Sequence, residues 1–273
     1  MKFSGMRGVV YSGVYDSYWD AQSKNVSEGF SSLEWLQRQK GFLDLAILDR
    51  NSLRIRPENL STLIYLLDDK LIKIIDFGGG SGWLFFALPE HAISKIGRYF
   101  VFENKDLILD VCRHIRARED VYTAVKDRLH YELSSNFNRK WALKNLDEST
   151  TNILYMNSVI QYLPNLEMFR DLASSIHYIL IEDVTEHSTQ SFWTTQRYYK
   201  TWIPRKIFHR NELVTELEKF GFLLTREIQY TSWLEKRYVY QNDSKKYTLN
   251  HPRSYIFKRQ ATKVDKSALP NLV

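Results

Sequence analysis

A cluster of glycines directly after an apolar segment is the feature that most limits how this chain can fold. Residues 73–83 read KIIDFGGGSGW, an apolar run that ends in Asp76 and is followed by Gly78, Gly79, Gly80 and Gly82. In a parallel α/β sheet such a turn lies at the carboxyl ends of the strands, where a backbone without side chains can touch a ligand. A glycine-rich turn can also simply connect two elements, but four glycines after a buried strand favour a nucleoside-containing ligand.

The pattern after Leu71 predicts an α/β fold, with a Rossmann-like, mostly parallel sheet of seven strands flanked by helices. Short apolar runs predict strands at 71–76, 98–103, 128–133, 152–157, 177–183, 223–230 and 253–258. Amphipathic segments between them predict helices at 105–118, 165–175 and 211–220, the last of which ends at Gly221. No helical pattern separates the last two strands, so we expect the final hairpin to run antiparallel.

Helical signals precede the glycine cluster. Ser31 lies three residues before Glu34, which is the spacing of a capping box, and Gly41 predicts the end of that helix. Pro57 suits the first position of a second helix, whose apolar stripe consists of Leu60, Leu63, Ile64 and Leu67. We therefore expect an N-terminal helical cap at 1–70, a ligand-binding domain at 71–260 and a flexible tail at 261–273.

The composition limits the compartment and the partners. The single cysteine, Cys112, excludes an intramolecular disulfide framework and a cysteine-cluster zinc site, which suits a reducing compartment. No apolar signal segment begins the chain, so we expect a cytoplasmic protein without a transmembrane segment. The seven histidines show no metal-ligand spacing, and no metal site is expected. A net charge of +6 leaves nucleic acid open as a partner, although the basic residues form no compact run.

Two nucleotide motifs are excluded by the residues around the glycines. Trp83 stands where the dinucleotide fingerprint needs a small residue, and no Lys followed by Ser or Thr completes a phosphate-binding loop. What remains, an acidic residue and then glycines at alternate positions, resembles the first motif of the class I methyltransferases, whose cofactor is S-adenosylmethionine. An acidic residue suits the positive charge of that cofactor.

The same resemblance assigns further residues to the cofactor and the acceptor. Glu103 ends the next strand at the spacing of a βαβ unit, where a carboxylate can accept both hydroxyls of a ribose. In the methyltransferase fold, Met156 and Asn157 at the end of the fourth strand would flank the cofactor. Gln161 and Tyr162 would face the substrate, although packing of a helix explains them equally well.

Several stretches are also similar to a narrower family of methyltransferases encoded beside surface polysaccharide biosynthesis genes. They are FSGMRGVVYSGVYDSYWDA, IIDFGGGSG, NSVIQYLP, YILIEDVTEHS and TQRYY, and they cover most of residues 3–230. This resemblance implies methyl transfer without naming the acceptor. The leading hypothesis is methylation of an oxygen of a glycan, a sugar nucleotide or a related small molecule. The chain has EDVTEH where the family often has DRTP after the fifth strand, which leaves the catalytic residue open.

Methyl transfer from a sulfonium is an in-line displacement, so the protein mainly aligns the acceptor, with a base where the acceptor is a hydroxyl. Asp183 and His187 follow the fifth strand and are the candidate bases, and Arg197 could bind an anionic acceptor. Three alternatives stay open. They are an RNA methyltransferase, a binding or scaffold subunit that retains the fold without catalysis, and an aminopropyl transferase, which usually has an acidic residue at the position of Ser81.

Overall fold

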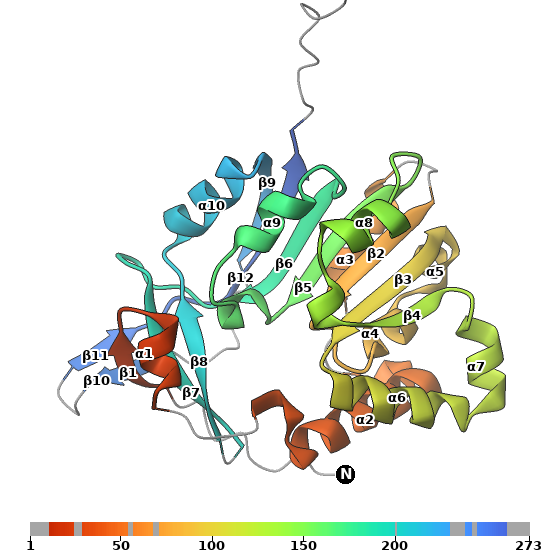
Figure 1. Ribbon diagram of the computed structural model, residues 1–273, viewed down its shortest axis with the longest axis horizontal. Coiled ribbons are helices and arrows are strands. Elements are labelled where there is room, and N and C mark those ends of the chain that lie inside the picture. Colours follow the sequence, from red (N-terminus) through yellow and green to blue (C-terminus); the bar gives the residue numbers. More distant parts are fainter. Residues whose placement is uncertain are drawn as a thin grey trace, which may run out of the picture.

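The computed structural model describes residues 11–24, 29–53, 57–67, 71–199, 201–229, 238–241 and 245–260. A seven-stranded sheet forms its centre (Figure 1). In spatial order its strands are β4 (Leu129–Leu133), β3 (Ile96–Glu103), β2 (Ile72–Phe77), β5 (Thr151–Asn157), β6 (Tyr178–Val184), β12 (Arg253–Arg259) and β9 (Phe222–Gln229). All seven predicted strands are present with ends shifted by at most two residues, which confirms the predicted fold class.

The strand directions explain where a ligand can bind. β2 lies in the middle and pairs in parallel with both β3 and β5, so that Asp76 is opposite Val101 on one side and Tyr155 on the other. Only β12 runs against its neighbours β6 and β9, which confirms the antiparallel final hairpin. The carboxyl ends of β2, β3, β5 and β6 therefore meet along one edge of the sheet.

Helices cover both faces of this sheet because the strands alternate their side chains between two apolar cores. One core contains Ile74, Tyr99 and Tyr155 and is covered by α2 (Leu33–Leu48), α3 (Glu58–Leu66), α4 (Trp83–Ala87), α5 (Glu90–Lys95), α6 (Lys105–Arg116) and α7 (Glu119–Val125). The other core contains Ile75 and Leu154 and is covered by α8 (Arg139–Asn145), α9 (Glu167–Leu172) and α10 (Arg210–Lys219). Among the described residues, no helix has the length and apolar character that a membrane crossing needs.

A second sheet of five strands stands beside the first (Figure 1). Its order is β11 (Lys245–Thr248), β10 (Tyr238–Gln241), β1 (Tyr11–Tyr15), β7 (Phe192–Tyr198) and β8 (Thr201–Ile207), and the short helix α1 (Tyr18–Gln22) packs on it. The N-terminal region is therefore not only helical, because β1 pairs with β7 and β10 far along the chain. The expected tail at 261–273 lies outside the described residues.

The N-terminal helices differ in their ends from the sequence prediction. α2 is capped by Ser32, whose side chain accepts from the amide of Trp35, rather than by Ser31. It also continues through Gly41, because Leu43 and Ala46 beyond the glycine are buried in the core and offset the cost of about 1 kcal/mol that glycine has in a helix. Pro57 was predicted to be the first residue of the helix, but it is the N-cap, and α3 begins one residue later at Glu58. Gly221, at φ 87°, follows α10 as predicted.

Candidate functional site

The glycine loop follows β2 directly and has the backbone that the sequence predicts. Gly78, Gly80 and Gly82 have φ values of 71°, 61° and 71°, in the left-handed region that other residues avoid. The amide of Gly78 donates to the carbonyl of Phe102 at 2.8 Å and ties the loop to the neighbouring strand. A Cβ atom on Gly79 would collide with the carboxylate of Asp76. The loop therefore packs directly against Asp76. A side chain at any of the four loop glycines would collide with a neighbouring residue.

Asp76 is a buried carboxylate with unused hydrogen-bonding capacity. Only 1% of its surface is exposed, and Oδ2 accepts from the Tyr99 hydroxyl at 2.7 Å. Oδ1 has no hydrogen-bond partner among the described residues. Burial raises the pKa of Asp76 to about 7, the Tyr99 hydrogen bond opposes this, and the charges of Glu103 and Glu182 add to it. A cationic group near this carboxylate would stabilise its charged form.

Glu103 lies at the end of β3, beside the glycine loop. Its Oε2 accepts from the backbone amide of Asn104 at 2.8 Å and from the side-chain amide of the same residue at 3.0 Å. Burial raises the pKa of Glu103, while the amides of Asn104 and Gly80 favour its charged form. The structure thus brings together Asp76, the glycine loop and Glu103, as the sequence predicts.

The sequence analysis did not identify Gln39 of α2, whose side chain and backbone carbonyl both contact Ser81 of the glycine loop. Its Oε1 accepts from the Ser81 amide at 3.1 Å, and its backbone carbonyl accepts from the Ser81 hydroxyl at 2.8 Å. A Cβ atom on Gly80 would collide with the Gln39 side chain. Gln39, Leu43 and Ala46 are the buried residues of α2 and follow helical spacing. A polar residue on that buried stripe is the signal that could have identified it.

Backbone strain marks the ends of β5 and β6. Ser158 and Asp183 have φ values of 57° and 56°, and neither is glycine. The Ser158 hydroxyl donates to Oδ2 of Asp183, so a hydrogen bond links the two strained residues. Such strain of about 1–3 kcal/mol per residue persists where the surroundings enforce it, and it clusters at functional sites. Asn157 is half-buried at this edge, whereas the side chain of Met156 is buried in the core under α8 and α9.

A buried polar cluster joins the two sheets next to this edge. Nη1 of Arg205, on β8, donates to the Tyr162 hydroxyl at 3.0 Å and to Oε1 of Gln196 at 2.7 Å. The Tyr162 hydroxyl donates to the same Gln196 oxygen at 2.9 Å, and Nη2 of Arg205 donates to Oγ1 of Thr185 at 2.7 Å. Tyr162, predicted from the sequence to face the acceptor, ends the short helix η4 (Ile160–Tyr162). Arg205 and Gln196 were not predicted.

Aromatic side chains close the other side of the same edge. The ring of Phe30, in the short helix η1 (Gly29–Ser31), lies 5.0 Å from that of Tyr162 and 5.3 Å from that of Tyr198. The rings of Trp35 and Tyr198 are 5.5 Å apart. We call Phe30, Trp35, Tyr162 and Tyr198 the aromatic wall. It links the N-terminal helices to the second sheet across the carboxyl ends of the strands.

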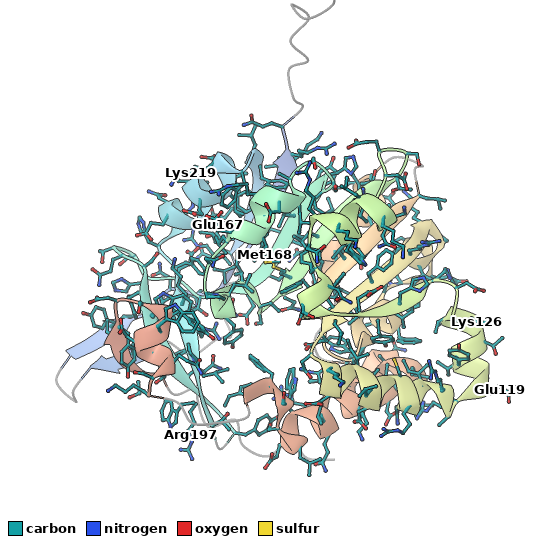
Figure 2. The ribbon with its side chains drawn as sticks, in the orientation of Figure 1. Glu119, Lys126, Glu167, Met168, Arg197 and Lys219 are labelled. Carbon is teal, nitrogen blue, oxygen red and sulfur yellow. The ribbon has the colours of Figure 1, made fainter. Side chains whose placement is uncertain are left out.

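Two predicted site residues lie elsewhere. The ring of His187 packs 5.6 Å from Phe192 and 5.4 Å from Tyr247, in the second sheet, and burial lowers its pKa. Arg197 is exposed, one position along β7 from the buried Gln196, so the two side chains leave opposite faces of the strand. Figure 2 shows Arg197 at the outer end of the β7–β8 hairpin, pointing away from the central sheet.

Neither the surface cavities nor the possible metal ligands among the described residues indicate a second functional site. One surface cavity lies beside α7 and another between α9 and α10, and neither contains a residue of the glycine loop. Within the described ranges, no group of three or more histidine, cysteine, aspartate and glutamate side chains could hold a metal ion. The carboxyl edge of the central sheet is therefore the candidate site.

No protein-family profile and no curated protein sequence matches this chain. Solved structures do resemble it. A protein from Listeria monocytogenes assigned to the S-adenosylmethionine-dependent methyltransferases matches with a TM-score of 0.50 and 10% identity, over 75% of this chain and 97% of its own. A methyltransferase of the same class from Clostridium acetobutylicum gives 0.45 and 9%, over 82% and 100%. The magnesium protoporphyrin IX methyltransferase from Synechocystis PCC 6803 gives 0.47 and 12%, over 85% and 96%. The first likeness, together with the strand order, shows that this chain has the fold of the S-adenosylmethionine-dependent methyltransferases.

Proposed function

We propose that this protein is an S-adenosylmethionine-dependent methyltransferase that methylates an oxygen of a small-molecule acceptor. The observation that carries the proposal is the unpaired Oδ1 of buried Asp76 beneath a glycine loop that has no room for side chains. A half-satisfied buried carboxylate is costly unless a bound group completes it. The ammonium and sulfonium groups of S-adenosylmethionine are cations, so this cofactor fits the site better than a phosphate-bearing nucleotide.

Each part of the site has a role toward that cofactor. Asp76 and the glycine loop would hold its cationic amino acid end, and Glu103 would accept the ribose hydroxyls. Bound S-adenosylmethionine supplies an electrophilic methyl group on a sulfonium. The aromatic wall would exclude water from the carboxyl edge, and Gln39 would hold α2 closed over the loop.

Asp183 is the base that the geometry favours for a hydroxyl acceptor. It lies at the carboxyl edge, accepts a hydrogen bond from Ser158 and is half-buried, whereas the His187 ring packs against Phe192 of the second sheet. Asp183 would take the proton from the acceptor hydroxyl as the oxygen attacks the methyl group. Glycans and sugar nucleotides remain acceptor classes because of the sequence resemblance to the polysaccharide-associated family.

Calorimetry with S-adenosylhomocysteine, the demethylated product, tests this function. We expect a single binding site in the wild-type chain and no binding heat in Gly80→Arg, whose side chain would enter the loop where Gln39 now lies. Gly41→Arg is the matched control, because a Cβ atom on Gly41 would meet nothing within 4 Å. Absence of heat in the wild-type protein, or equal heat in wild type and Gly80→Arg, would contradict the proposal.

A further inference from the structure

Arg205 is a buried cation without an ion-pair partner in the described part of the chain. Its exposed fraction is 3%, and its three hydrogen-bond acceptors, Tyr162, Gln196 and Thr185, are all neutral. Asp183 is near enough to act on it electrostatically, but no ion pair joins the two side chains. Taking a guanidinium out of water without a paired anion is unfavourable, so a structural role alone explains Arg205 poorly.

The surroundings of Arg205 contain more hydrogen-bond donors than acceptors. A guanidinium has five N–H groups, and the bonds just described use both hydrogens of Nη1 and one of Nη2. Nε has no partner among the described residues, and Nη2, which makes one printed bond, has a second hydrogen to donate. The ring of Tyr11 lies 5.6 Å from the guanidinium, and its buried hydroxyl also has no partner within the described ranges. The described residues around Arg205 therefore provide no anion to accept hydrogen bonds from these unused donors.

Gln161 adds a second, independent sign that a group is missing. It precedes Tyr162 in η4 and is fully buried, and neither its amide nitrogen nor its amide oxygen has a partner in the described residues. Buried amides are normally satisfied, and each exception calls for an explanation. Tyr11 and Arg205, which contact each other, and Gln161, the neighbour of Tyr162 in the chain, thus have unsatisfied polar atoms.

We propose that Arg205 and Tyr11 bind a carboxylate on the methyl acceptor, which makes the acceptor a hydroxycarboxylic acid such as a sugar acid. This proposal rests on the methyltransferase function proposed above and names its substrate class. Nε and Nη2 are neighbouring donors of the guanidinium, and together they could bind the two oxygens of a carboxylate. The Tyr11 hydroxyl supplies a further donor, and Asp183 lies beside the cluster to receive the proton of the acceptor hydroxyl.

A carboxylate fits better than a phosphate because of the local charge. Asp183 is the nearby acidic group that acts on Arg205, and Arg205 supplies one positive charge. With Arg205 and Asp183 both charged, a bound carboxylate leaves one net negative charge at the site, whereas a doubly charged phosphate leaves two. Arg197, the arginine predicted from the sequence, is exposed on the opposite face of the hairpin and cannot share this site.

Formate tests the proposal without knowledge of the whole acceptor, because it is the smallest carboxylate. The melting temperature of the full chain, saturated with S-adenosylhomocysteine, is measured against formate concentration at constant ionic strength, with chloride as the reference salt. We expect it to rise with formate in the wild-type protein, as ligand binding to the native state requires, and to stay flat in Arg205→Met. Arg226→Met removes an exposed guanidinium from β9 and is the matched control, which should follow the wild type.

Tyr11→Phe keeps the ring and removes only the hydroxyl. It therefore tests the proposed carboxylate site even if Arg205→Met does not fold. We expect it to raise the apparent formate dissociation constant about tenfold, which corresponds to one lost hydrogen bond. Equal formate responses in wild type, Arg205→Met and Tyr11→Phe would overturn the proposal. So would a flat wild-type response, or a phosphate response that depends on Arg205. If S-adenosylhomocysteine binds and formate has no effect, only this inference fails; if S-adenosylhomocysteine does not bind, the proposed function fails.

Discussion

Replacing Asp76 by asparagine should change how stability depends on pH. Asparagine has nearly the same shape, is neutral at every pH and keeps an oxygen that can accept from the Tyr99 hydroxyl. In the wild-type chain, burial raises the pKa of Asp76 from 3.8 to about 7 on folding. The native state therefore binds the proton more tightly than the unfolded chain between these two pH values. The free energy of unfolding should fall as pH rises through this window.

The magnitude follows from the size of the pKa change. About three pH units at 1.36 kcal/mol per unit give about 4 kcal/mol of wild-type stability that is present below pH 4 and lost above pH 7. Asp76→Asn lacks this contribution. The difference in stability between variant and wild type should thus shift in favour of the variant by about 4 kcal/mol between pH 4 and pH 8. Any constant cost of burying the asparagine amide cancels from this shift.

Urea unfolding of both proteins at several pH values between 4 and 8 measures the shift. Glu103 and Glu186 also have raised pKa values, but both proteins contain them, so their own contributions cancel from the difference. The difference reports the titration of Asp76 together with its electrostatic coupling to Glu103 and Glu182. A difference between the two proteins that stays constant with pH would refute the claim that Asp76 is buried with a raised pKa. The same samples test its role toward the cofactor, because Asp76→Asn should weaken the binding of S-adenosylhomocysteine and abolish any tightening with rising pH.

Other substitutions test the remaining parts of the site. Glu103→Ala should weaken S-adenosylhomocysteine binding by about 1.5–3 kcal/mol, or roughly 10- to 150-fold, by calorimetry, and an unchanged affinity would place the ribose elsewhere. Asp183→Asn should lower the rate constant of methyl transfer about 100- to 10,000-fold and leave cofactor affinity intact; a rate near that of the wild type would exclude Asp183 as the base. Gln39→Ala removes the acceptor of the Ser81 amide and should cost about 1–3 kcal/mol in urea unfolding, together with weaker cofactor binding. Leu60→Ala, in the fully buried core under α3, should cost about 2–5 kcal/mol without affecting cofactor affinity in the folded fraction.

The central sheet was predictable because its signals are local. Buried parallel strands appear as short apolar runs, and the turn after Asp76 needs left-handed backbone that glycine adopts without strain. Glu103 followed from the spacing of a βαβ unit. The length of α2 was not predictable from local signals, because burial of Leu43 against the sheet overrides the stop signal of Gly41.

The second sheet, which we propose contributes to acceptor binding, could not be predicted in the same way. Its strands are short and pair across long stretches of sequence, as with Ser12 and Thr195, and no local pattern encodes such pairing. Arg205 follows a proline and precedes Lys206 in the sequence TWIPRKI, which has no regular alternation, so nothing in its neighbourhood indicated that it is buried. Arg197 had the same chemistry in an aromatic segment, and only the pairing of β7 with β8 decides which of the two arginines faces inward.

The five-stranded sheet draws its strands from three separated parts of the chain, and this has a consequence for engineering and evolution. β1 lies between β7 and β10, so loss of the N-terminal strand would expose two strand edges that invite aggregation. The half of the protein that we propose recognises the acceptor therefore cannot be transferred to another scaffold as one continuous segment. Chimeras that exchange acceptor preference would have to transplant all three segments together, and a change of substrate by recombination should be rarer here than change by point mutation inside the sheet.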